Sequence, residues 1–141
     1  LREIHTWPVE PIQPDRAMRE VTRMAVERAK PADRQRTRDQ FGQTPTPDAV
    51  PVFSSFLVDA LGFFWIRDYQ PSRDAAGLGG PLYMEPAVGG TWRVFRPGGD
   101  EVGRVPMPRD FAPSQITGTE VLGVWRDDLD VEYVRVYGVM R

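Results

Sequence analysis

The sequence predicts a mainly β protein built from antiparallel four-stranded units, with a helical insertion near its N-terminus. Short runs of β-branched and aromatic residues follow one another from residue 53 onwards. Turn residues, mainly Gly, Pro and Asp, separate these runs. The same pattern begins again after residue 113, which indicates a repeated unit of sheet.

Size and composition restrict the class of protein. The chain has 141 residues, the length of one ordinary domain, and 40% of them are hydrophobic and 27% charged, as in globular proteins. It has no cysteine, which excludes disulfides, thiolate metal sites and cysteine nucleophiles. The net charge of -2 argues against a nucleic-acid partner, because phosphate binding usually needs a basic face. No apolar run is long enough to span a bilayer. Since the chain begins without Met, we expect a processed or truncated protein.

The first 30 residues are predicted to hold a strand and a helix. Residues 1–7 alternate apolar and polar side chains, and we expect a short strand that Pro8 and Pro11 close. A helix is expected to follow, with Asp15 as its N-cap. Apolar residues recur at helical spacing from there to Ala29.

A second, shorter helix is predicted after Pro31, which ends the first one. It covers residues 32–40, is capped by Asp33 and ends near Gly42. Its apolar content is low, so we expect a solvated helix. Three prolines then indicate an extended connector over residues 43–51.

The helical segment is basic. Residues 15–40 contain eight Lys or Arg against five Asp or Glu. One interpretation is an anionic docking surface. The other is a solvated helix face with mixed charges, which charge runs of this kind usually form.

Four strands are predicted in the first sheet and three in the second. The first set covers residues 53–58, 63–69, 91–95 and 101–105. The second set covers residues 115–116, 121–126 and 131–139. Residues 59–62 and 96–100 are predicted tight turns, with Gly62 supplying a positive φ. The connection over residues 70–90 is long for a compact domain, which is typical of a functional or mobile loop.

Four antiparallel strands that repeat every roughly 45–55 residues have the period of a β-propeller blade. One blade cannot bury both of its faces alone, so it stacks on neighbours around an axis. About one and three-quarter blades are predicted. They comprise a last strand of a preceding blade (1–11), a helical insertion with its connector (12–50), a complete blade (51–108) and a final three-stranded blade (109–141).

Several motifs resemble those of one propeller class. They are Pro51-Val52-Phe53, Phe56-Leu57-Val58-Asp59, Gly62-x-x-Trp65-Ile66, Trp92-x-Val94-Phe95-x-Pro97, Val121-Leu122-Gly123-Val124 and Asp127-x-x-Asp130-Val131-x-x-Val134-x-Val136-Tyr137. With them the chain resembles the C-terminal portion of a bacterial six-bladed β-propeller of the NHL/TolB-like class. The helical segment resembles an insertion that some members carry. The resemblance implies a periplasmic, secreted or cell-envelope protein.

The length departs from that class. A six-bladed ring needs about 250–300 residues at this period, and 141 residues cannot close one. The expected partners are therefore the remaining blades of a longer chain or another copy of this chain. A protein or small-molecule ligand is a further expectation.

A ligand-binding rim is expected at the strand ends, because propeller ligands commonly bind on the face that such loops form. Arg67, Asp68 and Tyr69 lie where a predicted strand enters the long connection. Arg126 and Asp127 occupy the corresponding place in the next unit. The other interpretation, an ordinary solvated strand end, is the one that the sequence favours at both places.

An acidic cluster follows the sixth predicted strand. Asp127, Asp128, Asp130 and Glu132 bring four carboxylates together, a density that can hold Ca²⁺. The glycine and glutamate positions of an EF-hand loop are missing. We therefore expect a hairpin turn in which Asp side chains accept bonds from nearby backbone N–H groups, and no metal site.

Other candidate sites have structural explanations. His5 is the only histidine and no G-x-S-x-G motif accompanies it, so no Ser-His-Asp triad is predicted. The glycines of residues 77–80 lack the Lys-Ser/Thr of a phosphate loop. Trp65, Trp92 and Trp125 lie within strands and are expected to pack between sheets.

Three functions follow from these observations. The first is a non-enzymatic propeller segment without cofactor, acting as a scaffold or as a ligand- or protein-binding surface. The second is part of a calcium-dependent, gluconolactonase-like hydrolase, which needs inward-facing Glu, Asp and Asn, although this chain contains no Asn. The third is a small independent β-barrel that acts as an interaction module.

Overall fold

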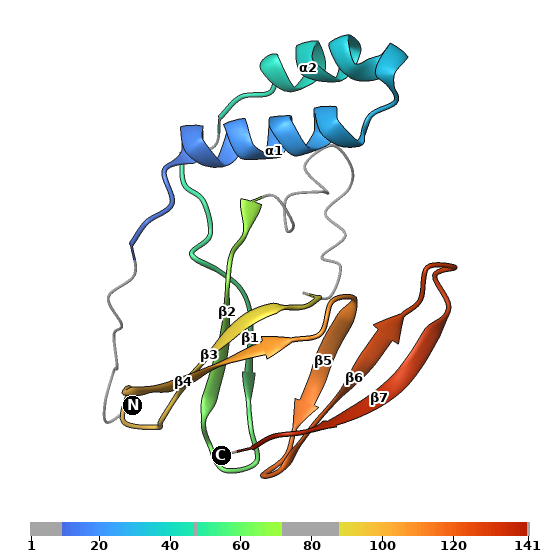
Figure 1. Cartoon of the computed structure of the whole chain (residues 1–141). Helices are drawn as coiled ribbons and strands as arrows, with labels where there is room; N and C mark the ends of the chain where they lie inside the picture. Colours follow the sequence, from blue (N-terminus) through green and yellow to red (C-terminus); the bar gives the residue numbers. More distant parts are fainter. Residues whose placement is uncertain (1–9, 47, 72–87, 141) are drawn as a thin grey trace. The chain divides into compact units, whose positions relative to one another are not determined.

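A computed structural model describes residues 10–46, 48–71 and 88–140 (Figure 1). The described chain is a small mixed α and β protein, with two helices followed by two open antiparallel sheets. Several predictions lie outside the described residues. They are the strand at residues 1–7, His5, the glycines 77–80 and most of the connection 70–90.

The described residues fall into two compact units. One unit contains both sheets, in residues 53–68 and 88–140. The other contains the helices and the described residues that flank them, up to residue 52 and from residue 69 to 71. None of the described helices is both long enough and apolar enough to cross a membrane.

The first helix, α1, spans Pro14–Arg28. It begins one residue before the predicted N-cap Asp15. Proline suits this position because an N–H in the first helical turn has no acceptor within the helix, so the N–H that proline lacks is not needed there. Gln13 is the N-cap and makes no side-chain capping bond, so the prediction of Asp15 as the cap was wrong. The burial of Ala17, Met18 and Val21 confirms the predicted apolar spacing in the first half of the helix.

A short 3₁₀ turn, η1 (Pro31–Asp33), leads into α2 (Arg34–Gly42). None of the residues of α2 is buried, which confirms the predicted solvated helix. Its N-cap is Asp33 as predicted, although the side chain makes no capping bond. The two helices lie side by side (Figure 1).

The first sheet is an antiparallel meander of four strands in sequence order. They are β1 (Phe53–Val58), β2 (Phe64–Asp68), β3 (Gly90–Phe95) and β4 (Glu101–Met107). All four were predicted. β4 continues two residues past its predicted end because Pro106 lies in an edge strand, where a missing N–H is tolerated.

The second sheet is a three-stranded meander, also in sequence order. It consists of β5 (Phe111–Ile116), β6 (Glu120–Arg126) and β7 (Glu132–Gly138). β5 begins four residues before the predicted start. The sequence prediction treated Pro113 as a break, but Pro113 lies in an edge strand beside a bulge and pairs with Gly123.

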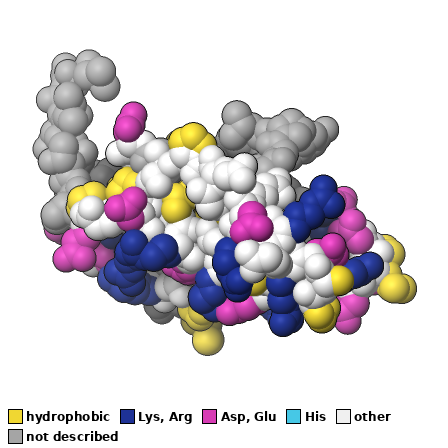
Figure 2. Space-filling view, turned by 90° about the horizontal axis from the view of Figure 1, so that it is seen from above, with side chains coloured by type: hydrophobic (Ala, Val, Ile, Leu, Met, Phe, Trp, Pro, Cys, Tyr) yellow, Lys and Arg dark blue, Asp and Glu magenta, His cyan; other side chains and the backbone are white. Residues whose placement is uncertain are grey.

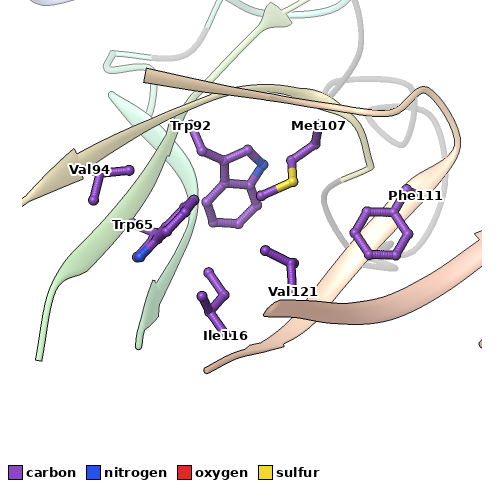
Figure 3. Packing of buried hydrophobic residues seen from close by; sticks show 7 residues of the cluster. All are labelled: Trp65, Trp92, Val94, Met107, Phe111, Ile116 and Val121. Carbon is purple, nitrogen blue, oxygen red and sulfur yellow. The ribbon is translucent and has the colours of Figure 1, made fainter. Parts of the chain in front are cut away.

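The two sheets pack face to face around one core (Figure 3). Trp65 and Trp92 of the first sheet point toward Ile116 and Val121 of the second. The buried cluster consists of Trp65, Trp92, Val94, Met107, Phe111, Ile116 and Val121. Trp65 and Trp92 therefore lie in the core as predicted, whereas Trp125 is partly buried at its edge, where the Arg135 guanidinium lies 3.6 Å from the centre of its ring.

A backbone hydrogen bond joins the two sheets, and one glycine allows close packing within the second sheet. The backbone N–H of Ala60, just after β1, donates to the carbonyl oxygen of Ile116 in β5 at 3.1 Å. Within the second sheet, a Cβ added to Gly123 of β6 would lie 2.2 Å from the Ala112 carbonyl and 2.7 Å from the Phe111 ring, both on the neighbouring strand β5. Only glycine fits there, and its absence of a side chain makes room for the buried Phe111 ring.

Candidate functional site

The predicted rim residue Arg67 is fully buried, with 0% of its surface exposed. Its Nε donates to the Gly89 carbonyl at 3.1 Å and one terminal nitrogen donates to the Val88 carbonyl at 3.4 Å. The other terminal nitrogen donates to the Ser54 hydroxyl. The guanidinium thus ties β1 and β2 to the segment that enters β3. Its interactions are those of a structural residue.

Asp68 and Tyr69 lie in different surroundings from Arg67. Asp68 points to the opposite face of the sheet, since side chains alternate along a strand. There its Oδ1 accepts bonds of 2.6 and 3.0 Å from the Arg93 guanidinium. Tyr69 belongs to the helical unit and donates its backbone N–H to the Val52 carbonyl at 3.2 Å. Arg67 and Asp68 therefore share no surface, and the binding rim stays a prediction.

Arg126 differs from Arg67 although both lie at the end of the second strand of a meander. It is partly exposed and donates to the Glu132 carboxylate at 2.7 and 3.1 Å. A weaker contact of 3.4 Å joins it to Asp130. This cluster lies at the surface, where such ion pairs contribute little stability.

Asp127 organises the hairpin between β6 and β7. Its Oδ1 accepts backbone N–H bonds of 2.9 Å from both Leu129 and Val131, which confirms the expected Asp-stabilised turn. Its Oδ2 accepts a bond of 3.2 Å from the Tyr133 hydroxyl. The Val131 bond is the largest cause that lowers the pKa of Asp127, followed among the hydrogen bonds by Leu129 and Tyr133. Within the described residues, no group of three His, Cys, Asp or Glu side chains could hold a metal ion.

Asp59 makes the same three contacts in the hairpin between β1 and β2. Its Oδ1 accepts N–H bonds of 2.9 Å from Leu61 and Phe63, and its Oδ2 accepts the indole N–H of Trp65 at 3.1 Å. Asp59 lies in one of the tight turns predicted from the sequence, but the contacts of its carboxylate were not predicted. The signal was available, because Asp59 and Asp127 are both followed six residues later by an aromatic residue with a polar hydrogen.

The two hairpins also share a backbone conformation. The N–H of each Asp donates to the carbonyl four residues later, at 3.0 Å for Asp59 and 3.1 Å for Asp127. The residue three positions along has a positive φ, 82° at Gly62 and 61° at Asp130. This is the three-residue hairpin loop that ends in a left-handed residue. In each hairpin the Asp carboxylate stabilises that loop by accepting two of its backbone N–H bonds.

An apolar groove of about 300 Å³ lies on the core-facing side of the first sheet. Its lining comprises Phe63, Trp65, Val94, Arg96, Val102, Gly103, Val105, Val139 and Met140. Gly103 pairs with Val94, and a Cβ placed on it would meet nothing within 4 Å. The groove therefore exists partly because this position lacks a side chain. Arg96 is the only charged residue of the lining.

The helical unit has a second groove, of about 330 Å³. Its lining comprises Asp15, Met18, Arg19, Thr22, Phe41, Gly42, Thr44 and Thr46. On α1, Arg23 pairs with Glu27 at 2.7 Å. On the face seen in Figure 2, Lys and Arg side chains are interspersed with Asp and Glu. The Arg23–Glu27 pair on α1 favours the mixed-charge interpretation of the basic segment over an anionic docking surface.

No known protein family, no curated protein and no solved structure matches this chain. The resemblance to six-bladed propellers therefore stays a prediction from the sequence motifs.

Proposed function

We propose that this chain is a non-catalytic binding scaffold whose two sheets are consecutive blades of a propeller-type stack. The observation that carries the proposal is that both sheets bear apolar side chains on both faces. A sheet that covers a core on one side only usually alternates apolar and polar residues along its strands. Sheets that are apolar on both faces belong between two neighbours.

The three-stranded sheet has an apolar face opposite the core. Val121 and Tyr137 form a cross-strand pair that packs in or against the core. The next pair along, Leu122 and Val136, therefore points outward, because successive residues of a strand face opposite sides. The pair formed by Val124 and Val134 points the same way, and Val134 is 81% exposed.

The four-stranded sheet is apolar on its outer side over β1 and β2, while Arg93 and Arg104 lie opposite each other on that side of β3 and β4. Leu57 pairs with Trp65 on the core side, so the neighbouring pairs point outward. These are Phe56 with Ile66, and Val58 with Phe64. Phe56 is 59% and Val58 50% exposed, which is unusual for such residues in adjacent positions of one strand face.

The coding sequence upstream of Leu1 tests the stack directly. Further four-stranded units with the strand–Asp-x-x-Gly–strand hairpin of Asp59 are expected there. A chain that lacks such units and behaves as a cooperatively melting monomer of 16.0 kDa would instead favour an independent interaction module.

The groove at Gly103 favours a second, compatible role, the binding of a small amphipathic anion. An apolar cavity of this size with one cationic side chain suits a ligand with an apolar body and a single acidic group. The probe is 8-anilinonaphthalene-1-sulfonate, whose fluorescence rises in apolar sites. The fluorescence is measured in a chain that also carries Val134→Lys. In that chain, Gly103→Leu fills the groove and should abolish the fluorescence, and Arg96→Gln should weaken it. An unchanged signal in the Gly103→Leu variant excludes the groove.

A further inference from the structure

We infer that the groove at Gly103 binds an aliphatic monocarboxylate, whose carboxylate pairs with Arg96 and whose unsubstituted chain lies along the apolar lining. This ligand class rests on the second proposed role, the binding of a small amphipathic anion, and makes it specific. It does not depend on the proposed stack of sheets.

Arg96 differs from the other arginines of the sheet unit because it has no partner. The structure describes seven arginines in this unit. Six of them make hydrogen bonds, ion pairs or ring contacts, and these are Arg67, Arg93, Arg104, Arg109, Arg126 and Arg135. Within the described part of the chain, the exposed Arg96 guanidinium makes no such contact. A cation without a counter-ion in the lining of an apolar groove favours an anionic ligand.

Val102 lines the groove because β4 has an irregularity at this residue. Val94 of β3 pairs with Gly103 of β4. The next residue, Phe95, pairs with Glu101 and leaves Val102 without a partner in this ladder. Such a β-bulge changes the direction of a side chain, and bulges are frequent beside binding and active sites. The bulge explains why the adjacent residues Val102 and Gly103 both line the same groove, although neighbours on a regular strand face opposite sides.

Gly103 keeps the middle of the groove open. A Cβ at this position would meet nothing within 4 Å, so the space beside it is free for a ligand. The volume of about 300 Å³ lies at the lower end of the range for small-molecule sites. The groove therefore suits a small ligand with a narrow body.

Apart from Arg96, the described residues of the lining offer no free polar side chain. They are Phe63, Trp65, Val94, Val102, Gly103, Val105, Val139 and Met140. The one N–H among these side chains, in the indole of Trp65, already donates to the Asp59 carboxylate at 3.1 Å. A hydroxyl, an amide or a second charge on the body of a ligand would lose its water there without gaining a partner, which is unfavourable. The lining thus favours an unsubstituted chain over sugars and peptides.

The cation lies at one end of the groove. Arg96 begins the turn between β3 and β4, where its backbone N–H donates to the Asp100 carbonyl at 2.9 Å. Val105 lies further along the sheet, because it pairs with Trp92, four residues before Arg96. At about 3.3 Å per residue, these two ends of the groove are about 13 Å apart, which suits a chain with its head on Arg96.

The head group is expected to carry a single negative charge. One guanidinium can bind a carboxylate through two parallel hydrogen bonds. The Asp100 carboxylate belongs to the same turn as Arg96, so it would repel a second negative charge. A monocarboxylate therefore fits better than a phosphate monoester.

The test is the affinity of the unaltered chain for octanoate, measured by isothermal titration calorimetry and checked by the rise in Tm. Octanol and octylammonium have the same chain with a neutral or a positive head. Octanedioate has the same head with a second carboxylate at the tail. Octanoate is expected to bind about 10-fold or more tightly than each of these three. Equal affinity for octanoate and octanol, or for octanoate and octanedioate, would overturn the inference.

Arg96→Gln and Arg104→Gln form a matched pair of variants. Arg104 is next to Gly103 on β4 but lies on the opposite side of the sheet, where it pairs with Glu101 at 2.7 Å. Arg96→Gln is expected to weaken octanoate binding by about 10- to 100-fold, because the ligand loses charge-assisted hydrogen bonds. Arg104→Gln should leave the affinity unchanged. Equal octanoate affinities of the two variants would exclude Arg96 as the residue that binds the head group.

Arg96→Glu should produce a gain that misfolding cannot imitate. The variant is expected to lose octanoate binding and to prefer octylammonium, because the charge at the end of the groove is reversed. Circular dichroism and melting show whether the variant is folded. A folded Arg96→Glu chain that still prefers octanoate would contradict the assignment.

Failure of this ligand class is distinguishable from failure of the groove itself. If the dye fluorescence depends on Gly103 but octanoate does not displace the dye, the groove stands and the ligand class is wrong. If the fluorescence does not depend on Gly103, both fall. Displacement by octanoate and not by octanol supports both.

Discussion

The Asp59 carboxylate accepts the indole N–H of Trp65 at 3.1 Å, and this bond connects a surface hairpin to the centre of the core. Trp65 is one of the largest fully buried side chains, and its ring packs between the sheets. The same carboxylate holds the backbone of the turn through Leu61 and Phe63. The turn thereby fixes the orientation of the tryptophan against the second sheet.

Replacing Asp59 with Ala should lower the free energy of unfolding by about 2–4 kcal/mol, because three donors lose one acceptor group and the indole N–H is left unpaired in the interior. Asp59→Asn, which keeps one carbonyl oxygen for the turn, should lose less. Urea unfolding followed by tryptophan fluorescence measures both. A loss below about 1 kcal/mol for Asp59→Ala would contradict this role.

The stabilising effect of the Asp127 charge should depend on pH. Hydrogen bonds from the Val131 and Leu129 backbone and from Tyr133 lower the pKa of Asp127 in the folded chain. The contribution is therefore present above the unfolded value of about 3.9 and is lost as pH falls through the lower folded value. The Tm difference between the unaltered chain and Asp127→Asn should be constant near neutral pH and shrink below about pH 4. A Tm difference that grows as the pH falls would contradict the prediction.

Gly90→Ala should destabilise the first sheet, whereas Gly103→Ala should not. Gly90 has a φ of 79°, and an added Cβ would lie 2.9 Å from Nε of the enclosed Arg67. We expect a loss of about 1–3 kcal/mol, from the positive φ and from displacement of the guanidinium. At Gly103 a Cβ meets nothing within 4 Å, so the change should be neutral or stabilise by up to about 1 kcal/mol. Equal losses in thermal unfolding of the two variants would refute the crowding at Gly90.

Arg67→Lys should cost far more stability than Arg126→Lys. The three nitrogens of the Arg67 guanidinium donate to two carbonyls and a hydroxyl. A lysine ammonium cannot reach all three acceptors. We expect a loss of about 2–4 kcal/mol at Arg67. At the partly exposed Arg126 the change should stay within about 0.5 kcal/mol. Similar losses at both positions would mean that Arg67 is not the structural residue that its contacts indicate.

Much of the sheet structure was predictable because its signals are local. Runs of β-branched and aromatic residues marked all seven described strands, and glycines marked the tight turns after β1 and β3. The errors lie at prolines. Pro106 and Pro113 were treated as ends of strands, yet both lie in edge strands, and a sequence does not show which strands are at an edge. The N-cap was placed at Asp15 instead of Gln13 for a related reason, since proline is favourable inside the first turn of a helix.

The candidate site was less predictable than the fold. Arg67 and Arg126 have the same setting in sequence, each following a β run and preceding an Asp. Their burial differs because Ser54, Val88 and Gly89 surround the Arg67 guanidinium, whereas Arg126 keeps 44% of its side chain exposed. The groove at Gly103 also depends on which strands become neighbours, because it is formed by β2, β3, β4 and the end of the chain.

The order and type of the elements followed from the sequence alone, since propensity, hydrophobic alternation and turn chemistry act over a few residues. Tertiary structure decided which face of each sheet became interior. Each sheet carries apolar side chains on both of its faces, so hydrophobic patterning alone did not identify the interior face. Trp65 and Trp92 pack against Ile116 and Val121, so these side chains lie on the interior faces. Phe56 and Val134 lie on the opposite faces and are exposed.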